Sequence, residues 1–201
     1  MKTIGQLVEE SINLSDRGIP EYAFFTACDA LRHTAEKVYE GHELAEPEFQ
    51  LFIRDNWRLI SFMGIPSTDT IPANLPFGLR RAIPSLNTPN LAQEIIIHAV
   101  RHTLSTRRLP LEIGFSKFGG ITVENEQLLF PKSLLFAILS SVILNPVNKD
   151  EKCSDNYWIS IWDFKMFISE LWGRMDIAER VMNLYQDRPG VKTDWSTEQK
   201  A

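Results

Sequence analysis

Two segments of the chain place histidines and carboxylates at helical spacing. Side chains three or four positions apart share one face of an α-helix, and carboxylate–histidine stripes on two helices can hold paired metal ions. A metal-dependent enzyme is therefore one hypothesis for this protein. The candidate ligands are Asp29, His33 and Glu36 in the first stripe and Glu94, His98 and His102 in the second.

The apolar positions of the same segments favour a plainer interpretation. In the first segment Phe24, Cys28 and Leu31 share the apolar face, and helical geometry places His33 nearly opposite them. In the second segment His102 lies at the edge of the apolar face. The Glu-x-x-His spacing of di-metal helical bundles is also missing from the sequence. We therefore expect both stripes to be polar helix surface, and the sequence requires no cofactor.

An Arg-His pair occurs twice, within nearly identical pentapeptides. Residues 30–34 read "ALRHT" and residues 99–103 read "AVRHT". A structural duplication would preserve the flanking residues and the orientation of each histidine relative to its apolar face. The flanking residues do not match, and periodicity predicts different orientations for His33 and His102. We therefore attribute the similarity to chance.

Basic side chains are concentrated in the middle of the chain. Residues 80–132 contain seven basic and four acidic residues, whereas residues 1–55 contain five basic and eleven acidic ones. A helix that ends in basic residues and continues into a hairpin is the layout of a winged helix, so a nucleic-acid binder using segment 101–117 is a second hypothesis. Its candidate contacts are Arg101, Arg107, Arg108 and Lys117. The formal net charge of −5 argues against nucleic acid as the partner.

The sequence contains no compact catalytic motif. It has no Gly-x-Ser-x-Gly elbow and no glycine-rich phosphate-binding fingerprint. Cys28 lies on the apolar face of its helix and is expected to be a small buried side chain. Cys153 lies in a polar loop near Lys149 and Lys152, with no evident histidine partner. Whether the protein is an enzyme stays open.

Aromatic residues are dense between positions 157 and 172. They are Tyr157, Trp158, Trp162, Phe164, Phe167 and Trp172. Helical spacing of Phe164, Phe167 and Leu171 favours core packing. Trp158 and Trp162 have no clear place in that pattern, so they are the candidates for lining an apolar pocket or a partner surface.

One predicted helix resembles a helix of a known family. The stretch 21–41, "EYAFFTACDALRHTAEKVYEG", is similar to the helix that carries the pattern A-x-x-A-x-E-K in HEPN domains, with Ala35, Glu36 and Lys37 matching that fragment. The resemblance covers about a tenth of the chain. It implies a small helical bundle of a kind often associated with RNA cleavage. The nuclease signature of that family, an arginine followed within two helical turns by a histidine, is not found in a suitable late helix, so no catalytic residue is carried over.

Periodicity, prolines and glycines divide the chain into the elements that would position these residues. Helices are predicted at residues 4–14, 21–40, 45–63, 91–106, 131–144, 163–172 and from 176 onward. The Pro-rich segment 64–90 is expected to pack down as a loop with one short helical turn at 77–82. Turn signals at Gly119-Gly120 and Asn125-Glu126 predict a small antiparallel β-meander around residues 110–130. Residues 157–162 are predicted to form a short strand.

The predicted fold is therefore mainly α, with about six or seven helices and that small meander. We expect one mainly helical domain at residues 1–186 and a loose tail at 187–201. Two cysteines without metal-type spacing, and no signal-peptide core or membrane-length apolar run, predict a cytoplasmic protein without a membrane partner. The leading hypothesis is a non-catalytic binding or regulatory protein for an unknown small molecule or protein. A homo-oligomer stays open.

Overall fold

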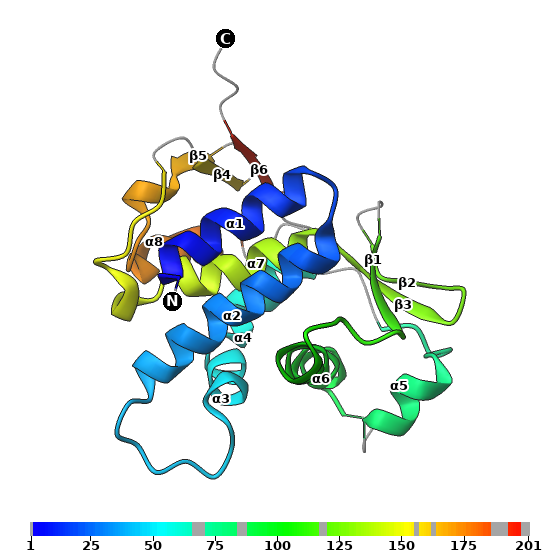
Figure 1. Ribbon diagram of the computed structural model, residues 1–201. Coiled ribbons are helices and arrows are strands. Elements are labelled where there is room, and N and C mark those ends of the chain that lie inside the picture. Colours follow the sequence, from blue (N-terminus) through cyan, green and yellow to red (C-terminus); the bar gives the residue numbers. More distant parts are fainter. Residues whose placement is uncertain are drawn as a thin grey trace.

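The computed structural model describes residues 2–65, 71–83, 88–116, 120–154, 157–161, 164–185 and 193–197 (Figure 1). Within them it is mainly α-helical with a small β part, which confirms the predicted fold class. The helices of this described part are α1 (Ile4–Asp16), α2 (Pro20–Val38), α3 (Glu48–Asp55), α4 (Trp57–Gly64), α5 (Phe77–Ala82), α6 (Leu91–Thr106), α7 (Ser133–Ile143) and α8 (Met175–Leu184). Two short 3₁₀ helices span Pro146–Asn148 and Ile168–Glu170.

The core is built around α7. Every residue of this helix from Leu134 to Ile143 is buried, and α7 packs against both α2 and α4. A helix that is apolar nearly all round has no face to offer to water, so burial on all sides is its most favourable environment. The predicted central position of this segment is confirmed.

Helices α1 and α2 form an antiparallel pair on one side of α7 (Figure 1). Gly18, at φ 76°, makes the turn between them, and Pro20 starts α2. The facing residues of α2 include the fully buried Ala23 and Ala27, whose small side chains allow α1 to approach closely. Ser11 Oγ donates a buried hydrogen bond of 2.7 Å to the carbonyl oxygen of Ala23 and fixes the register of the pair.

The single helix predicted at residues 45–63 is two helices. α3 ends at Asp55 and α4 begins at Trp57, with Asn56 between them at φ −96° and ψ 11°. Asn56 Nδ2 donates to the carbonyl oxygen of Phe52 at 2.9 Å. An asparagine side chain that bonds to nearby backbone competes with helix continuation, which accounts for the break.

The first small sheet contains β1 (Ile113–Ser116), β2 (Thr122–Glu124) and β3 (Gln127–Pro131) in the order β1-β3-β2. β2 and β3 form the predicted antiparallel hairpin, with Asn125 and Glu126 both at positive φ in the turn. The predicted all-antiparallel meander is wrong for β1, which runs parallel to β3. β1 carries the buried Ile113, and β3 offers the buried Leu128 beside it, whereas β2 has no buried residue. Burial of apolar surface therefore favours the β3 edge.

The second small sheet contains β4 (Tyr157–Ile161), β5 (Phe164–Phe167) and β6 (Thr193–Thr197) in the order β5-β4-β6, all antiparallel. β4 confirms the predicted strand. The helix predicted at 163–172 is wrong, because residues 164–167 pair with β4 instead. Residues 193–197 also differ from the predicted loose tail. They supply the hydrogen-bonding partners that the second edge of β4 would otherwise lack.

Part of the Pro-rich segment lies within the described residues. Residues 77–82 form α5, the predicted short helix, and Leu75, Leu79 and Ile83 are buried. Their burial accords with the expectation that this segment packs against the core. Residues 66–70 and 84–87 lie outside the described part of the chain.

Within the described residues, no helix combines the length and the apolar character that crossing a lipid bilayer requires.

Candidate functional site

An open groove runs along the outer face of α1 and α2. It consists of two adjoining hollows of about 620 Å³ and about 520 Å³, which share Lys2 and His33. The first hollow is lined by Lys2, Leu7, Glu10, Leu14, Tyr22, Phe25, Thr26, Asp29, Arg32, His33 and Arg107. The second is lined by Lys2, Thr3, Ile4, His33, Glu36, Lys37, Glu40 and Glu151. We call these two hollows together the α1–α2 groove.

The helix pair presents two parallel stripes to this groove. Glu10 and Leu14 lie on the α1 side, and Tyr22, Phe25 and Asp29 follow one another at helical spacing on the α2 side. Tyr22 is 66% exposed, so the groove offers an uncovered apolar surface between charged side chains. Two antiparallel helices with such stripes form the kind of surface on which a third helix can pack.

Arg107 reaches the groove from the end of α6. Its backbone is left-handed, at φ 60° and ψ 26°, a conformation that typically costs a non-glycine residue roughly 1–2 kcal/mol. Its guanidinium carbon lies 5.1 Å from the centroid of the Phe25 ring, and Nη1 lies 3.8 Å from Oδ2 of Asp29. The side chain is 72% exposed. The groove therefore contains a cation that rests on an aromatic face and remains accessible to a ligand.

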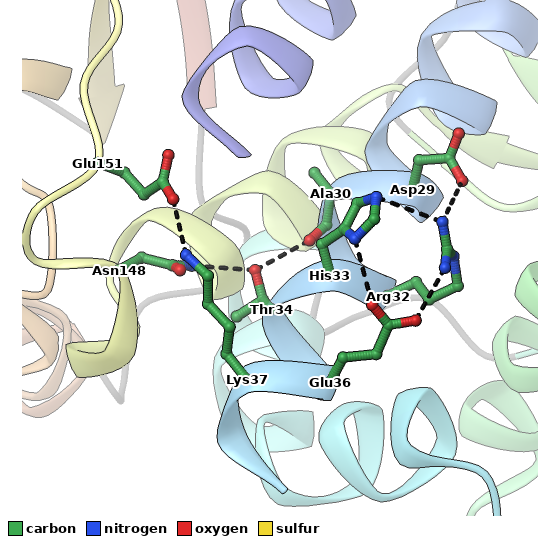
Figure 2. Close-up of polar contacts among 9 residues, drawn as sticks. All are labelled: Asp29, Ala30, Arg32, His33, Thr34, Glu36, Lys37, Asn148 and Glu151. Carbon is green, nitrogen blue, oxygen red and sulfur yellow. Dashed lines mark hydrogen bonds and ion pairs between the residues drawn. The ribbon is translucent and has the colours of Figure 1, made fainter. Parts of the chain in front are cut away.

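The charged side chains of α2 are connected to one another along this face (Figure 2). Arg32 donates to Glu36 at 2.8 Å and lies 3.5 Å from Asp29. His33 contacts Glu36 through Nδ1 at 3.2 Å and Arg32 through Nε2 at 3.3 Å. Arg32 can only donate, so these contacts fit the tautomer of His33 that carries its proton on Nδ1. The network fixes the direction of the imidazole at the junction of the two hollows.

Glu151 joins three distant parts of the chain at the end of the groove. Its carboxylate accepts a hydrogen bond from the backbone N–H of Gly5 at 3.0 Å. It accepts another from Lys37 Nζ at 2.7 Å, which Figure 2 shows. The first N–H groups of a helix have no partner within it and favour a negative charge. Glu151 therefore stabilises the start of α1 and ties it to the end of α2.

A buried hydrogen-bond chain supports α2 from behind. Asn148 is fully buried, and its Nδ2 donates to Thr34 Oγ1 and to the carbonyl oxygen of Val142, both at 2.9 Å. Thr34 Oγ1 donates in turn to the carbonyl oxygen of Ala30 at 2.9 Å (Figure 2). The loop after α7 is therefore held to the inner side of α2, opposite the groove.

The first predicted metal stripe lies in the groove but is already engaged. Asp29 is near Arg32 and Arg107, and Glu36 contacts Arg32 and His33. The side chains of Asp29 and His33 are 17% and 18% exposed, so they are more enclosed than the predicted polar helix surface. Across the described residues, no three histidine, cysteine or acidic side chains come together as a ligand set for a metal ion.

The second predicted metal stripe, on α6, is also dispersed. Glu94 turns toward Arg54, whose Nη2 lies 3.3 Å from its Oε1. His98 and His102 remain neighbours, with ring centroids 6.3 Å apart. The pKa of His98 is lowered, first by burial and then by His102 and Arg101, while Glu112 opposes the shift. The stripe therefore separates into an ion pair and a pair of imidazoles.

Two of the predicted nucleic-acid contacts, Arg101 and Arg107, contact different helices. Arg101 donates to Gln50 of α3 at 2.9 Å, whereas Arg107 turns to Phe25 and Asp29 of α2. Arg108 is exposed, and Lys117 lies outside the described residues. Of the three described arginines, only Arg107 lines the groove.

Trp158, a predicted pocket aromatic, lies on β4. Lys165 Nζ lies 4.3 Å from the centroid of the Trp158 ring. Trp158 pairs with Phe167 of β5 in the sheet. Trp158 is not among the residues that line the groove or the apolar cavity described below. Trp162 lies outside the described part of the chain.

Several groove residues escaped prediction from the sequence. Tyr22 and Phe25 are aromatic residues on the face of α2 that turns away from α7, and that position was the available signal. No sequence pattern could identify Glu151, because its contact with Gly5 joins residues 146 positions apart. Arg107 was predicted to bind, but as part of a nucleic-acid surface.

Fold and groove together define a mainly helical protein with two small sheets and an open groove lined by charged side chains. The chain belongs to the Rv1289 family, whose sequence profile matches residues 3–198. Similar proteins are "Uncharacterized protein Rv1289" of Mycobacterium tuberculosis and "Uncharacterized protein Mb1320" of Mycobacterium bovis. Each is 25% identical over 188 residues, which cover 90% of this chain and 89% of the relative. No solved structure matches the chain.

Proposed function

We propose that this protein is a non-catalytic binding protein that holds an amphipathic helical segment of a partner protein in the α1–α2 groove, with a carboxylate of that segment paired to Arg107. The observation that carries this proposal is the combination of an exposed aromatic stripe with Arg107, a cation held at a strained backbone position above Phe25. Strained backbone persists where the surrounding structure enforces it, and it is concentrated at binding sites.

The chemistry of the groove suggests what the partner must offer. The apolar stripe of Leu14, Tyr22 and Phe25 requires an apolar helix face, with side chains at helical spacing. Arg107 lies at the longer limit for an ion pair with Asp29, and its side chain is mostly exposed. A carboxylate on the partner can therefore pair with it without leaving a buried charge unpaired.

A cytoplasmic location belongs to the same proposal. No disulfide joins Cys28 and Cys153. Cys28 is fully buried, and burial raises the pKa of its thiol well above the usual range. Such a thiol is a packing residue rather than a nucleophile, which supports the non-catalytic interpretation.

The proposal is tested with a selected peptide. A display library of amphipathic helical peptides is panned on the whole protein, and the enriched peptides are titrated by fluorescence anisotropy. We expect the selected peptides to share one carboxylate beside their apolar face, at the position that meets Arg107. Arg107→Gly should weaken binding roughly 10-fold or more, because a charge-assisted hydrogen bond is lost. Tyr22→Ala should weaken binding through the apolar stripe.

Arg108→Ala is the matched control, since it removes the neighbouring exposed arginine, which does not line the groove. Arg107→Gly should fold normally, because glycine relieves the left-handed strain. If no peptide is enriched, or if enriched peptides bind the Arg107→Gly and Arg108→Ala variants equally well, the groove is not the binding site.

A further inference from the structure

A second and separate space lies on the other side of α7, between α4, α8 and the sheet of β4 and β5. Its walls are apolar apart from one hydroxyl group, that of Ser140 in α7. The empty space at this site is about 400 Å³, which includes space open to solvent, and the part wide enough for a water molecule is only about 20 Å³. Without a ligand, this apolar cavity therefore has room for about one water molecule.

Ser140 departs from a pattern that recurs among the helical hydroxyl groups of the described residues. Five serines and threonines donate to the carbonyl oxygen four residues earlier: Thr26, Thr34, Ser61, Ser105 and Thr106. Ser141, the next residue, donates to the carbonyl oxygen of Ile138 at 2.7 Å. Ser140 is 1% exposed, and its Oγ has no hydrogen-bond partner among the described residues. Thr103 Oγ1 is also buried without a hydrogen-bond partner among the described residues, but Thr103 does not line the cavity.

A buried hydroxyl group without a partner is unfavourable, because it has lost its bonds to water and gained none. A single water would find only this one polar group in the cavity, whereas buried waters typically make about three hydrogen bonds. A molecule that is apolar apart from one hydrogen-bonding group would satisfy Ser140 and the apolar walls together.

The walls of the cavity can adapt to such a molecule. Met63, Met166 and Met182 approach it from three different elements, and methionine side chains change shape at low cost. Benzene fits an apolar cavity of about 150 Å³, so a ring-sized ligand needs these side chains to move aside. Phe62 also lines the cavity, and its side chain is only partly buried.

We propose that the apolar cavity is a binding site for a small apolar molecule that carries one hydrogen-bonding group, which pairs with Ser140 Oγ. This site is independent of the α1–α2 groove and takes a different class of ligand. Phenol is the simplest probe of that chemistry, and toluene is its match in shape without the hydroxyl group.

The test compares these two probes on the whole protein. Ligand-observed NMR titration should show that phenol binds more tightly than toluene. Ser140→Ala should reduce phenol affinity about five-fold, the effect of one hydrogen bond, and leave toluene affinity unchanged. Ser141→Ala is the matched control and should retain the preference for phenol, because its hydroxyl group is already engaged with Ile138.

The methyl resonances of the methionines locate the probe without any substitution. Those of Met63, Met166 and Met182 should shift with phenol, and that of Met175 in α8, which does not line the cavity, should shift less. Three results would overturn the proposal: no binding of either probe at millimolar concentration, equal phenol affinity in wild type and Ser140→Ala, or methyl shifts that spare the three lining methionines. Peptide binding by the groove should be unaffected by Ser140→Ala, so the two proposals fail separately.

Discussion

Helices α2 and α6 carry nearly the same five residues, at 30–34 and 99–103, and the structure treats them alike in burial but not in partners. In both, the alanine, the aliphatic residue and the threonine are buried, while the arginine and histidine face outward. Both histidines are partly buried, so their burial does not distinguish the different orientations that periodicity predicted. A pentapeptide with this apolar spacing is sufficient to determine which side turns to the core.

The partners differ because they come from other parts of the chain. Thr34 receives a hydrogen bond from Asn148, 114 residues away, whereas Thr103 is equally buried and its Oγ1 has no partner among the described residues. His33 lies between Arg32 and Glu36, whereas His98 on α6 faces His102, Arg101 and Glu112. Local sequence therefore determines the burial of a residue, and the tertiary fold determines its chemistry.

The largest effect is expected where α1 meets the loop after α7, the same loop whose Asn148 supports Thr34 of α2. A Cβ atom on Gly5 would lie well inside contact distance of the backbone oxygen of Lys152, beside Glu151. Backbone cannot rotate away as a side chain can, so Gly5→Ala should destabilise the protein by about 3 kcal/mol or prevent folding. Urea unfolding followed by circular dichroism measures this.

Gly41→Asn is the control for Gly5→Ala. Gly41 has open space around its Cβ position and a φ of 78°, which asparagine tolerates better than other residues. Its cost should be below about 1 kcal/mol. Similar losses in the two variants would mean that the contact between α1 and the loop after α7 contributes little.

Substitutions of Thr34 and Thr103 test the comparison between α2 and α6 directly. Thr34→Val removes the acceptor of Asn148 Nδ2 and should cost about 1–2 kcal/mol, because a buried donor loses one of its two partners. Thr103→Val removes a buried hydroxyl group that has no partner, so it should be neutral or stabilising by up to about 1 kcal/mol. Urea midpoints of the two variants are compared under identical conditions. Equal destabilisation by both would contradict the assignment of partners.

Sequence patterns were reliable where one segment contained the whole signal. The apolar character of α7 predicted its central place, and Asn125-Glu126 predicted the hairpin turn. Patterns failed where the signal lay in a distant segment. The parallel pairing of β1 with β3, the pairing of β6 with β4, and the contact of Glu151 with Gly5 each depend on which parts of the chain meet after folding. Periodicity carries no information about such pairing.

The same limit applied to the candidate site. Spacing identified Asp29, His33 and Glu36 as a group, and they do lie together on α2. Spacing could not show that Arg107, from the end of α6, would meet that group above Phe25. One added arginine changes the chemistry of the face, because a carboxylate paired with a guanidinium group is less available to a metal ion.

The smallest effect expected is a dependence of stability on pH that arises from α6. The pKa of His98 is lowered in the folded protein, chiefly by burial, so the folded state favours the neutral imidazole. The unfolded state, with a histidine pKa of about 6.5, then binds more protons as the pH falls. His98 should therefore contribute stability above about pH 6.5 that is lost as the pH falls through its lowered pKa.

Two substitutions isolate this contribution. His98→Asn should flatten the decrease in stability between neutral and mildly acidic pH, measured as urea midpoints across a pH series. Glu112→Gln should lower the pKa of His98 further, because Glu112 is the group that opposes the shift. An NMR titration of the imidazole measures that pKa directly. A His98 pKa at or above that of free histidine would mean that this face of α6 is as open to water as its sequence suggested.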